Sequence, residues 1–128
     1  MRRGREILLL SALCAAAQAA QPALGPCVSS ARAEGGLRLV FRAPATGAPR
    51  GAQITLLLRL HSEPPGQVRV NGREARVASQ ARGWAAVPLP RGVAWQRIIV
   101  EPGEPFNGCR DPASAPYLVF EPPPGGKK

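Results

Sequence analysis

The stretch QVRVNGREARV, residues 67–77, alternates apolar and charged residues on both sides of an Asn-Gly pair. Asn-Gly is the preferred pair for a two-residue type I′ turn, because both turn positions need a positive φ. Such a turn gives a hairpin four facing pairs: Val70–Arg73, Arg69–Glu74, Val68–Ala75 and Gln67–Arg76. Facing residues share one side of a sheet. The register therefore predicts a valine-rich inner face with Arg73 at its turn end, a charged outer face, and a weak Arg69–Glu74 ion pair.

Segments with a period of two continue on either side of this hairpin. The clearest is QITLLLRLH, residues 53–61, in which Leu56, Leu58 and Leu60 point to one side. Four more segments alternate in the same way: 37–43, 83–90, 94–102 and 116–121. The fifteen prolines of the chain stand outside any helical pattern, and proline is poorly tolerated inside helices. Short strands between Pro- and Gly-rich turns predict an all-β sandwich or barrel of about seven strands.

The first 19 residues have the features of a signal peptide. A basic start, MRRGRE, is followed by the apolar run ILLLSALCAAA, residues 7–17. This run is too short for a membrane span, which needs about 20 residues, and Ala17-Gln18-Ala19 fits a cleavage site after Ala19. Cys14 follows the bulky Leu13, which argues against a lipidated cysteine. We expect a periplasmic or secreted protein with a signal peptide over 1–19, one domain over 20–121 and a disordered tail over 122–128.

Cleavage after Ala19 would leave two cysteines, Cys27 and Cys109, and would lower the net charge from +9 to +7, because three arginines and one glutamate leave with the peptide. An even number of cysteines in an exported chain predicts a disulfide. The Cys27–Cys109 bond would close a loop of about 80 residues, worth roughly 4 kcal/mol in the chain-entropy account. Two cysteines and the single His61 do not make up a zinc site without an added carboxylate, so we expect no metal and no cofactor.

Between Ala43 and Glu101 the chain runs through a proline-rich loop, an apolar strand, V-x-V-N-G-x-x-A-x-V, a Gly-aromatic step, V-P-L, a glycine and a last strand. The residues of this order are Val68, Val70, Asn71, Gly72, Ala75, Val77, Gly83, Trp84, Val87, Pro88, Leu89, Gly92, Ile98 and Val100. In them the chain resembles the bacterial immunoglobulin-like modules found in surface proteins and beside the catalytic domains of secreted glycosidases. The resemblance implies a non-catalytic immunoglobulin-like antiparallel β-sandwich. The Cys27/Cys109 pair lies outside the pattern.

Charge and aromatic residues suggest where such a module would bind. Four arginines, Arg69, Arg73, Arg76 and Arg82, gather in sequence around the hairpin, and a basic protein attracts anionic ligands. Trp95 is the better candidate for an exposed stacking surface, whereas Trp84 follows a glycine where related modules bury an aromatic residue. The alternative is that these arginines only solvate the outer face of a sheet, and that alternative stays open at this point.

Three classes of function follow from these features. The first is an exported non-catalytic binding or adhesion module at the cell envelope, acting on carbohydrate or another anionic ligand; nucleic acid is not expected there. The second is a structural or accessory subunit of an envelope protein complex, which would expose an apolar patch around Leu57, Val40 and Ile99. The third is a small hydrolase, which would need His61 to meet a carboxylate in a pocket. No serine stands in a nucleophile motif, so we do not expect an enzyme.

Overall fold

The computed structural model describes residues 22–123. The predicted signal peptide and its cleavage site, Cys14, and residues 124–128 of the predicted tail lie outside the described residues. Within 22–123 the chain forms antiparallel strands and two 3-10 turns, Ala81–Gly83 and Pro112–Ser114, and contains no α-helix. The strands are β1 (Ala23–Ala33), β2 (Gly36–Phe41), β3 (Gln53–Arg59), β4 (Gln67–Val70), β5 (Arg73–Arg76), β6 (Ala78–Ser79), β7 (Trp84–Pro88), β8 (Arg97–Glu101) and β9 (Tyr117–Glu121). The all-β class predicted from the sequence is confirmed.

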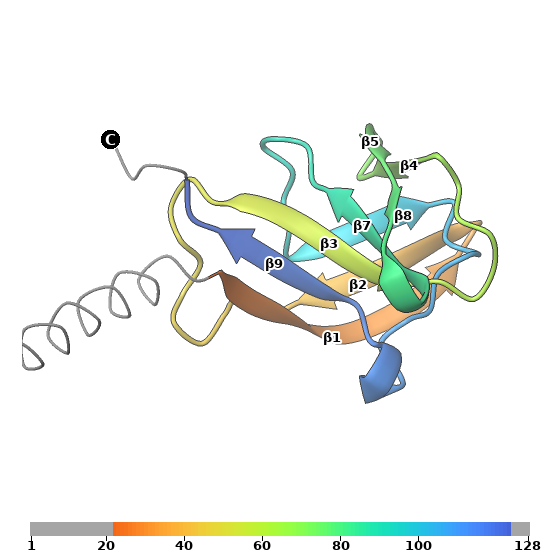
Figure 1. The fold of residues 1–128 in the computed structure, drawn as a ribbon, viewed down its shortest axis with the longest axis horizontal. Coiled ribbons are helices and arrows are strands. Elements are labelled where there is room, and N and C mark those ends of the chain that lie inside the picture. The colour runs from red at the N-terminus through yellow and green to blue at the C-terminus, as the bar shows by residue number, and fades with distance from the viewer. Residues whose placement is uncertain (1–21, 124–128) are drawn as a thin grey trace, which may run out of the picture.

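Hydrogen-bonded strands lie side by side in the order β5-β4-β8-β2-β1-β9-β3-β7-β6. They fold into two layers, with β9, β3 and β7 lying across β2 and β8 (Figure 1). We call β9, β3, β7 and β6 layer I, and β2, β8, β4 and β5 layer II. The two layers face each other with side chains between them, so the molecule is a sandwich that is nearly closed into a barrel.

Two stretches of chain join the layers. The first four residues of β1, Ala23–Pro26, pair with β9 in layer I, and the rest of β1 pairs with β2 in layer II, with an irregularity between Cys27 and Ser29. On the other side only Val77 separates β5 from β6, although these two strands stand at opposite ends of the strand order. Both long sides of the sandwich are therefore closed by continuous chain.

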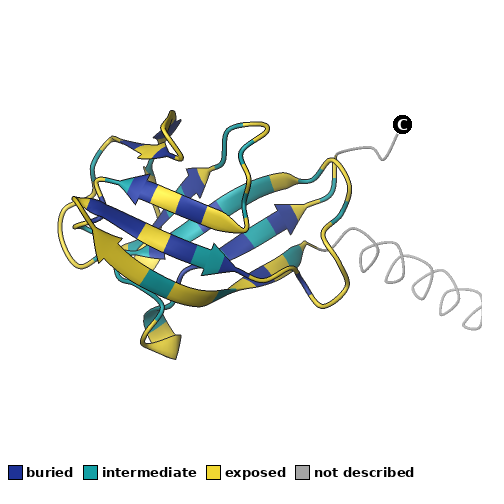
Figure 2. Cartoon of the chain, turned by 180° about the vertical axis from the view of Figure 1, so that it is seen from behind, coloured by how far each residue is buried: buried dark blue, intermediate teal, exposed yellow. Residues whose placement is uncertain are grey.

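The core lies between the layers and is built mainly from alternate residues of β2, β3, β4, β7, β8 and β9, with Ala75 of β5 and Phe106 of the segment after β8. Buried and exposed positions alternate along the strands (Figure 2), as expected where one face of a sheet packs and the other is solvated. The buried apolar residues are Leu37, Leu39, Phe41, Leu56, Leu58, Val68, Val70, Ala75, Ala85, Val87, Ile98, Val100, Phe106, Leu118 and Phe120. No charged or polar side chain is buried among the described residues.

The hairpin of β4 and β5 has the register that its sequence predicts. All four facing pairs, from Val70–Arg73 to Gln67–Arg76, are present, and Asn71 (φ 50°) and Gly72 (φ 83°) both take the positive φ of a type I′ turn. The ion pair of Arg69 differs from the prediction. Its Nε lies 4.0 Å from Oε1 of Glu101 on β8, because β4 has a second neighbour whose Glu101 also faces Arg69.

The structure has nine strands where the sequence predicted about seven. The two unpredicted strands are β1 and β6. β1 contains Gly25, Pro26, Ser29 and Ser30 and lacks the alternation of large apolar residues that marks a half-buried strand. β6 has two residues, and its pairing with β7 depends on the path of the chain after β5.

One end of the sandwich is covered by the segment after β8. Phe106 of this segment is fully buried and forms a bridge with Leu60. Arg32 of β1 donates to the carbonyls of Gly103 (2.9 Å) and Phe106 (2.6 Å). Gly103 packs so tightly that a Cβ there would clash with the backbone nitrogen of Leu37. We call this the closed end. No helix of the described residues is long and apolar enough to cross a membrane.

Candidate functional site

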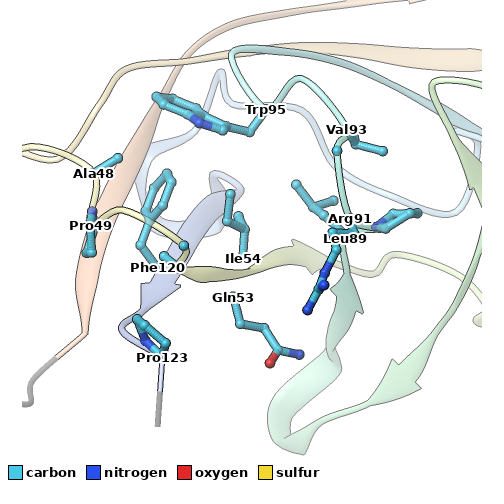
Figure 3. A pocket seen from close by; sticks show the side chains of 14 residues that line it. Ala48, Pro49, Gln53, Ile54, Leu89, Arg91, Val93, Trp95, Phe120 and Pro123 are labelled. Carbon is cyan, nitrogen blue, oxygen red and sulfur yellow. The ribbon is translucent and has the colours of Figure 1, made fainter. Parts of the chain in front are cut away.

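The opposite end of the sandwich is hollow. The β2–β3 loop, the β7–β8 loop and the end of β9 surround a pocket of about 800 Å³, a volume within the usual range for small-molecule sites. Its lining residues are Ala48, Pro49, Gly51, Ala52, Gln53, Ile54, Leu89, Pro90, Arg91, Gly92, Val93, Trp95, Phe120 and Pro123. We call it the open-end pocket (Figure 3).

Trp95 forms one wall of the open-end pocket. Its ring meets Phe120 edge to face, with centroids 5.0 Å apart and an interplanar angle of 82°, a favourable aromatic geometry. Phe120 is fully buried, whereas Trp95 is half-buried. Trp95 is thus fixed by the core on one side and lines the pocket on the other. Ile54 and Leu89, both half-buried, continue the apolar surface away from Trp95 (Figure 3).

Polar groups lie across the pocket from Trp95. The guanidinium of Arg91 and the side-chain amide of Gln53 occupy the side opposite the indole (Figure 3), and both residues are exposed. A small number of polar groups around an apolar floor is typical of ligand pockets. Arg91, Gln53 and Phe120 were not candidates from the sequence. The only local signal for Arg91 is its place in the turn PLPRG, residues 88–92, four residues before Trp95.

The turn of the β4–β5 hairpin holds the β7–β8 loop in place. Arg73 donates from Nη1 to the carbonyl oxygen of Arg91 at 2.6 Å. Asn71 donates from Nδ2 to the carbonyls of Ala94 and Arg97, each at 3.2 Å. These bonds hold the chain on both sides of Trp95. The hairpin turn therefore positions Arg91 and Trp95 at the pocket.

The four arginines that cluster in sequence lie in three places. Arg69 and Arg76 are on the outer face of layer II, where Glu74 and Glu101 lie among them. Arg73 is at the open end under the β7–β8 loop. Arg82 is in the 3-10 turn between β6 and β7, next to Gly83, whose carbonyl bonds Leu60 at the closed end. Of the four arginines, Arg73 lies at the β7–β8 loop, which carries Trp95, and the other three lie away from this loop.

Trp84 is not a core residue, contrary to the prediction. Its neighbours Ala85 and Val87 along β7 are the buried ones, so the alternation of the strand turns Trp84 to the outer face of layer I. There it meets Tyr117 edge to face at 5.6 Å, and the guanidinium of Arg59 lies 5.8 Å from the centre of its ring. Arg59 covers the indole, in a cation–π arrangement.

Cys27 and Cys109 lie side by side, as the predicted disulfide requires. Both are half-buried thiols in the structure. Burial, followed by the hydrogen bond and charge of the neighbouring Cys109, raises the pKa of Cys27 well above its ordinary value. Ser30 accepts from the backbone N–H of Cys109 at 3.0 Å and so fixes that residue beside β1. The bond itself stays a prediction.

The residues considered for hydrolysis and metal binding do not gather around the open-end pocket. Three carboxylates, Glu34, Glu74 and Glu101, line a second hollow of about 500 Å³ beside β4 and β8, and no histidine or cysteine is in its lining. His61 is exposed, and its Nδ1 lies 2.7 Å from Oδ1 of Asn107 at the closed end. Among residues 22–123, no three His, Cys, Asp or Glu side chains are grouped so that they could hold a metal ion. The open-end pocket, which combines an aromatic wall with an exposed guanidinium, is the candidate site.

No family model, no curated protein and no solved structure matches this chain.

Proposed function

We propose that this chain is a small exported, non-catalytic binding module of the immunoglobulin-like type, which holds a ligand of the cell envelope in the open-end pocket. The observation that carries the proposal is the difference between the two ends of the sandwich. Phe106 and its hydrogen-bonded segment cover one end, whereas the other end has a pocket of about 800 Å³ with an aromatic wall.

The pocket is suited to binding without catalysis. Its floor is apolar, its polar groups are an arginine and an amide, and its lining contains no carboxylate, histidine, cysteine or serine. General acid–base and nucleophilic catalysis need such groups within reach of the substrate. An indole wall is typical of sites that pack against the apolar face of a sugar or another ring, since tryptophan combines a large apolar surface with one polar N–H.

The test is a titration that reports on Trp95 alone. In the Trp84→Phe protein, Trp95 is the single tryptophan, so its fluorescence follows the pocket. Neutral and carboxylated oligosaccharides are added, and amide NMR shifts locate the bound ligand. We expect shifts at residues 48–54 and 89–95 and a loss of affinity of about tenfold in Trp95→Ala, from lost aromatic contact.

Trp95→Phe is the companion variant, because it keeps an aromatic ring against Phe120 and is expected to keep the fold. Ligands that leave the fluorescence of Trp95 and the pocket amides unchanged would contradict the proposal. So would equal affinity in the parent protein and a folded Trp95→Ala variant.

An accessory subunit is the second candidate, favoured by the outer face of layer I. This face is mostly apolar, and Leu24 at its edge is 57% exposed. Its apolar side chains come from β1, β9, β3 and β7 and include Leu24, Leu57, Trp84, Ala86, Tyr117 and Val119. Gln53, Thr55, Arg59 and Glu121 lie on the same face. The patch expected from the sequence is divided, because Val40 and Ile99 lie on the outer face of layer II. A monomer by light scattering that stays soluble alone would disfavour this candidate.

A further inference from the structure

We propose that the ligand of the open-end pocket is a carboxylated saccharide, whose ring packs on Trp95 and whose carboxylate pairs with the guanidinium of Arg91. This inference rests on the proposed function, because it assigns the chemistry that the same pocket selects. It is carried by the charge of the pocket, by the way Arg91 is held, and by the positions of Arg91 and Trp95 on opposite walls.

The pocket carries a single positive charge. Of its fourteen lining residues, Arg91 is the one with an ionisable side chain, and no Asp or Glu is among them. Arg50, between two residues of the lining, adds charge of the same sign. The nearest carboxylate by strand register belongs to Glu121, opposite Gln53; it is exposed and lies outside the lining. A ligand with one negative group is therefore favoured at the Arg91 side.

Arg91 is held by its backbone and free at its side chain. Its carbonyl accepts the 2.6 Å bond from Arg73, and Gly92, which follows it, has a φ of 85° that closes the turn. The ion pair found among the described residues joins Arg69 and Glu101, on layer II. The exposed guanidinium of Arg91 is thus available, and its planar fork matches a carboxylate with two parallel hydrogen bonds. Arg73 is the positioning residue for this contact.

The opposite wall determines the rest of the ligand. Ile54 lies between the guanidinium of Arg91 and the indole of Trp95, and Phe120 lies next to the indole (Figure 3). A ligand that spans the pocket must have a charged end and an apolar face, as a sugar acid has. The amide of Gln53, on the same side as Arg91, can exchange hydrogen bonds with a hydroxyl. A polyphosphate chain fits less well, because binding along such a chain uses several cationic contacts and this lining has one.

The test compares two ligands that differ in the carboxylate alone. A trisaccharide with one uronic acid residue and the neutral trisaccharide of the same linkage are titrated into the Trp84→Phe protein at low salt, with the fluorescence of Trp95 and amide NMR as readouts. We expect the acidic trisaccharide to bind about tenfold more tightly than the neutral one, as for one charge-assisted hydrogen-bonded pair. Arg91→Gln removes this preference, and Arg91→Lys keeps part of it.

Arg76→Gln is the matched control, because it removes the same charge from the outer face of layer II. It is expected to leave the preference unchanged. A preference lost equally in Arg76→Gln and Arg91→Gln would assign it to the net charge and overturn the inference. Equal binding of the two trisaccharides would overturn the inference while upholding the pocket as a binding site. Binding of neither at the pocket would overturn both proposals.

Discussion

Asn71 shows how one residue can serve both the turn and the site. Its positive φ allows the two-residue turn, which any Asn-Gly hairpin would need. Its side chain makes three further hydrogen bonds. Oδ1 accepts from the N–H of Ile99 at 2.8 Å, and Nδ2 donates to the carbonyls of Ala94, in the loop before β8, and of Arg97, the first residue of β8. Asn71 therefore replaces a missing strand neighbour at the start of β8 and fixes the loop that carries Trp95.

Asn71→Ala should lower the free energy of unfolding by about 1–3 kcal/mol. Three side-chain hydrogen bonds are lost, and alanine tolerates the positive φ less well than asparagine. Denaturant unfolding measures the change, and amide NMR should show the largest shifts at residues 94–99. Asn71→Asp keeps the acceptor for Ile99 and should lose less. Stability within about 0.5 kcal/mol of the parent protein would contradict this role, since that is the range of ordinary surface substitutions.

At the scale of the element, β3 is central to layer I because it pairs with both β7 and β9. Leu56 and Leu58 are fully buried. Leu57, between them, turns to the outer face beside Tyr117 of β9 and is half-buried. Three consecutive leucines of one strand thus have different surroundings, because successive side chains of a strand point to opposite faces.

Leu58→Ala and Leu57→Ala form a matched pair with the same change of side chain. Leu58→Ala should destabilise the protein by about 2–5 kcal/mol, the usual cost of a cavity in a packed core. Leu57→Ala should cost less than about 1 kcal/mol, because Leu57 lies on the outer face, where water can occupy the space of the removed side-chain atoms. Thermal and urea unfolding of the two variants checks the difference. Equal losses would mean that the outer face of layer I is covered in solution, as the accessory-subunit candidate requires.

At the scale of the whole molecule, the sandwich depends on how its first and last segments are joined. Cys27 lies where β1 changes from one layer to the other, and Cys109 lies in the segment that leads from the closed end to β9. A bond between them would link the layer crossing to that segment. It would therefore restrain the unfolded chain over most of its length.

The oxidised protein should unfold at a higher temperature than the reduced protein, with a difference in free energy of up to roughly 4 kcal/mol. Calorimetry with and without reductant measures it, and mass spectrometry after alkylation counts free thiols. The Cys27→Ser/Cys109→Ser double variant should melt like the reduced protein in both conditions. Two free thiols in protein prepared from an oxidising compartment would refute the bond.

The reduced protein should also lose stability as the pH rises above about 9.0, the ordinary pKa of the thiol. The pKa of Cys27 is raised in the folded state, so the unfolded thiol loses its proton first and ionisation favours unfolding. Below the ordinary pKa this contribution is fully present. Urea unfolding of the reduced protein at several alkaline pH values, compared with reduced Cys27→Ser, isolates this loss; parallel curves would contradict it.

Local pattern determined the parts of this fold in which neighbours in sequence are neighbours in space. The period of two in β3 and the Asn-Gly turn were sufficient for the all-β class, for the hairpin register and for the alternation of Leu56, Leu57 and Leu58. These features depend on backbone geometry over a few residues, which a single sequence displays directly.

Contacts between distant segments were decided only by the tertiary structure. β1 has no strand pattern and is held by its two partners, β9 and β2. Arg69 has Glu101 as its ion-pair partner, because β8 comes to lie beside β4. The open-end pocket unites loops more than 30 residues apart, and Arg73 supports its wall through a bond to a carbonyl. Backbone acceptors are present at every residue, so the sequence alone could not indicate which one Arg73 would find.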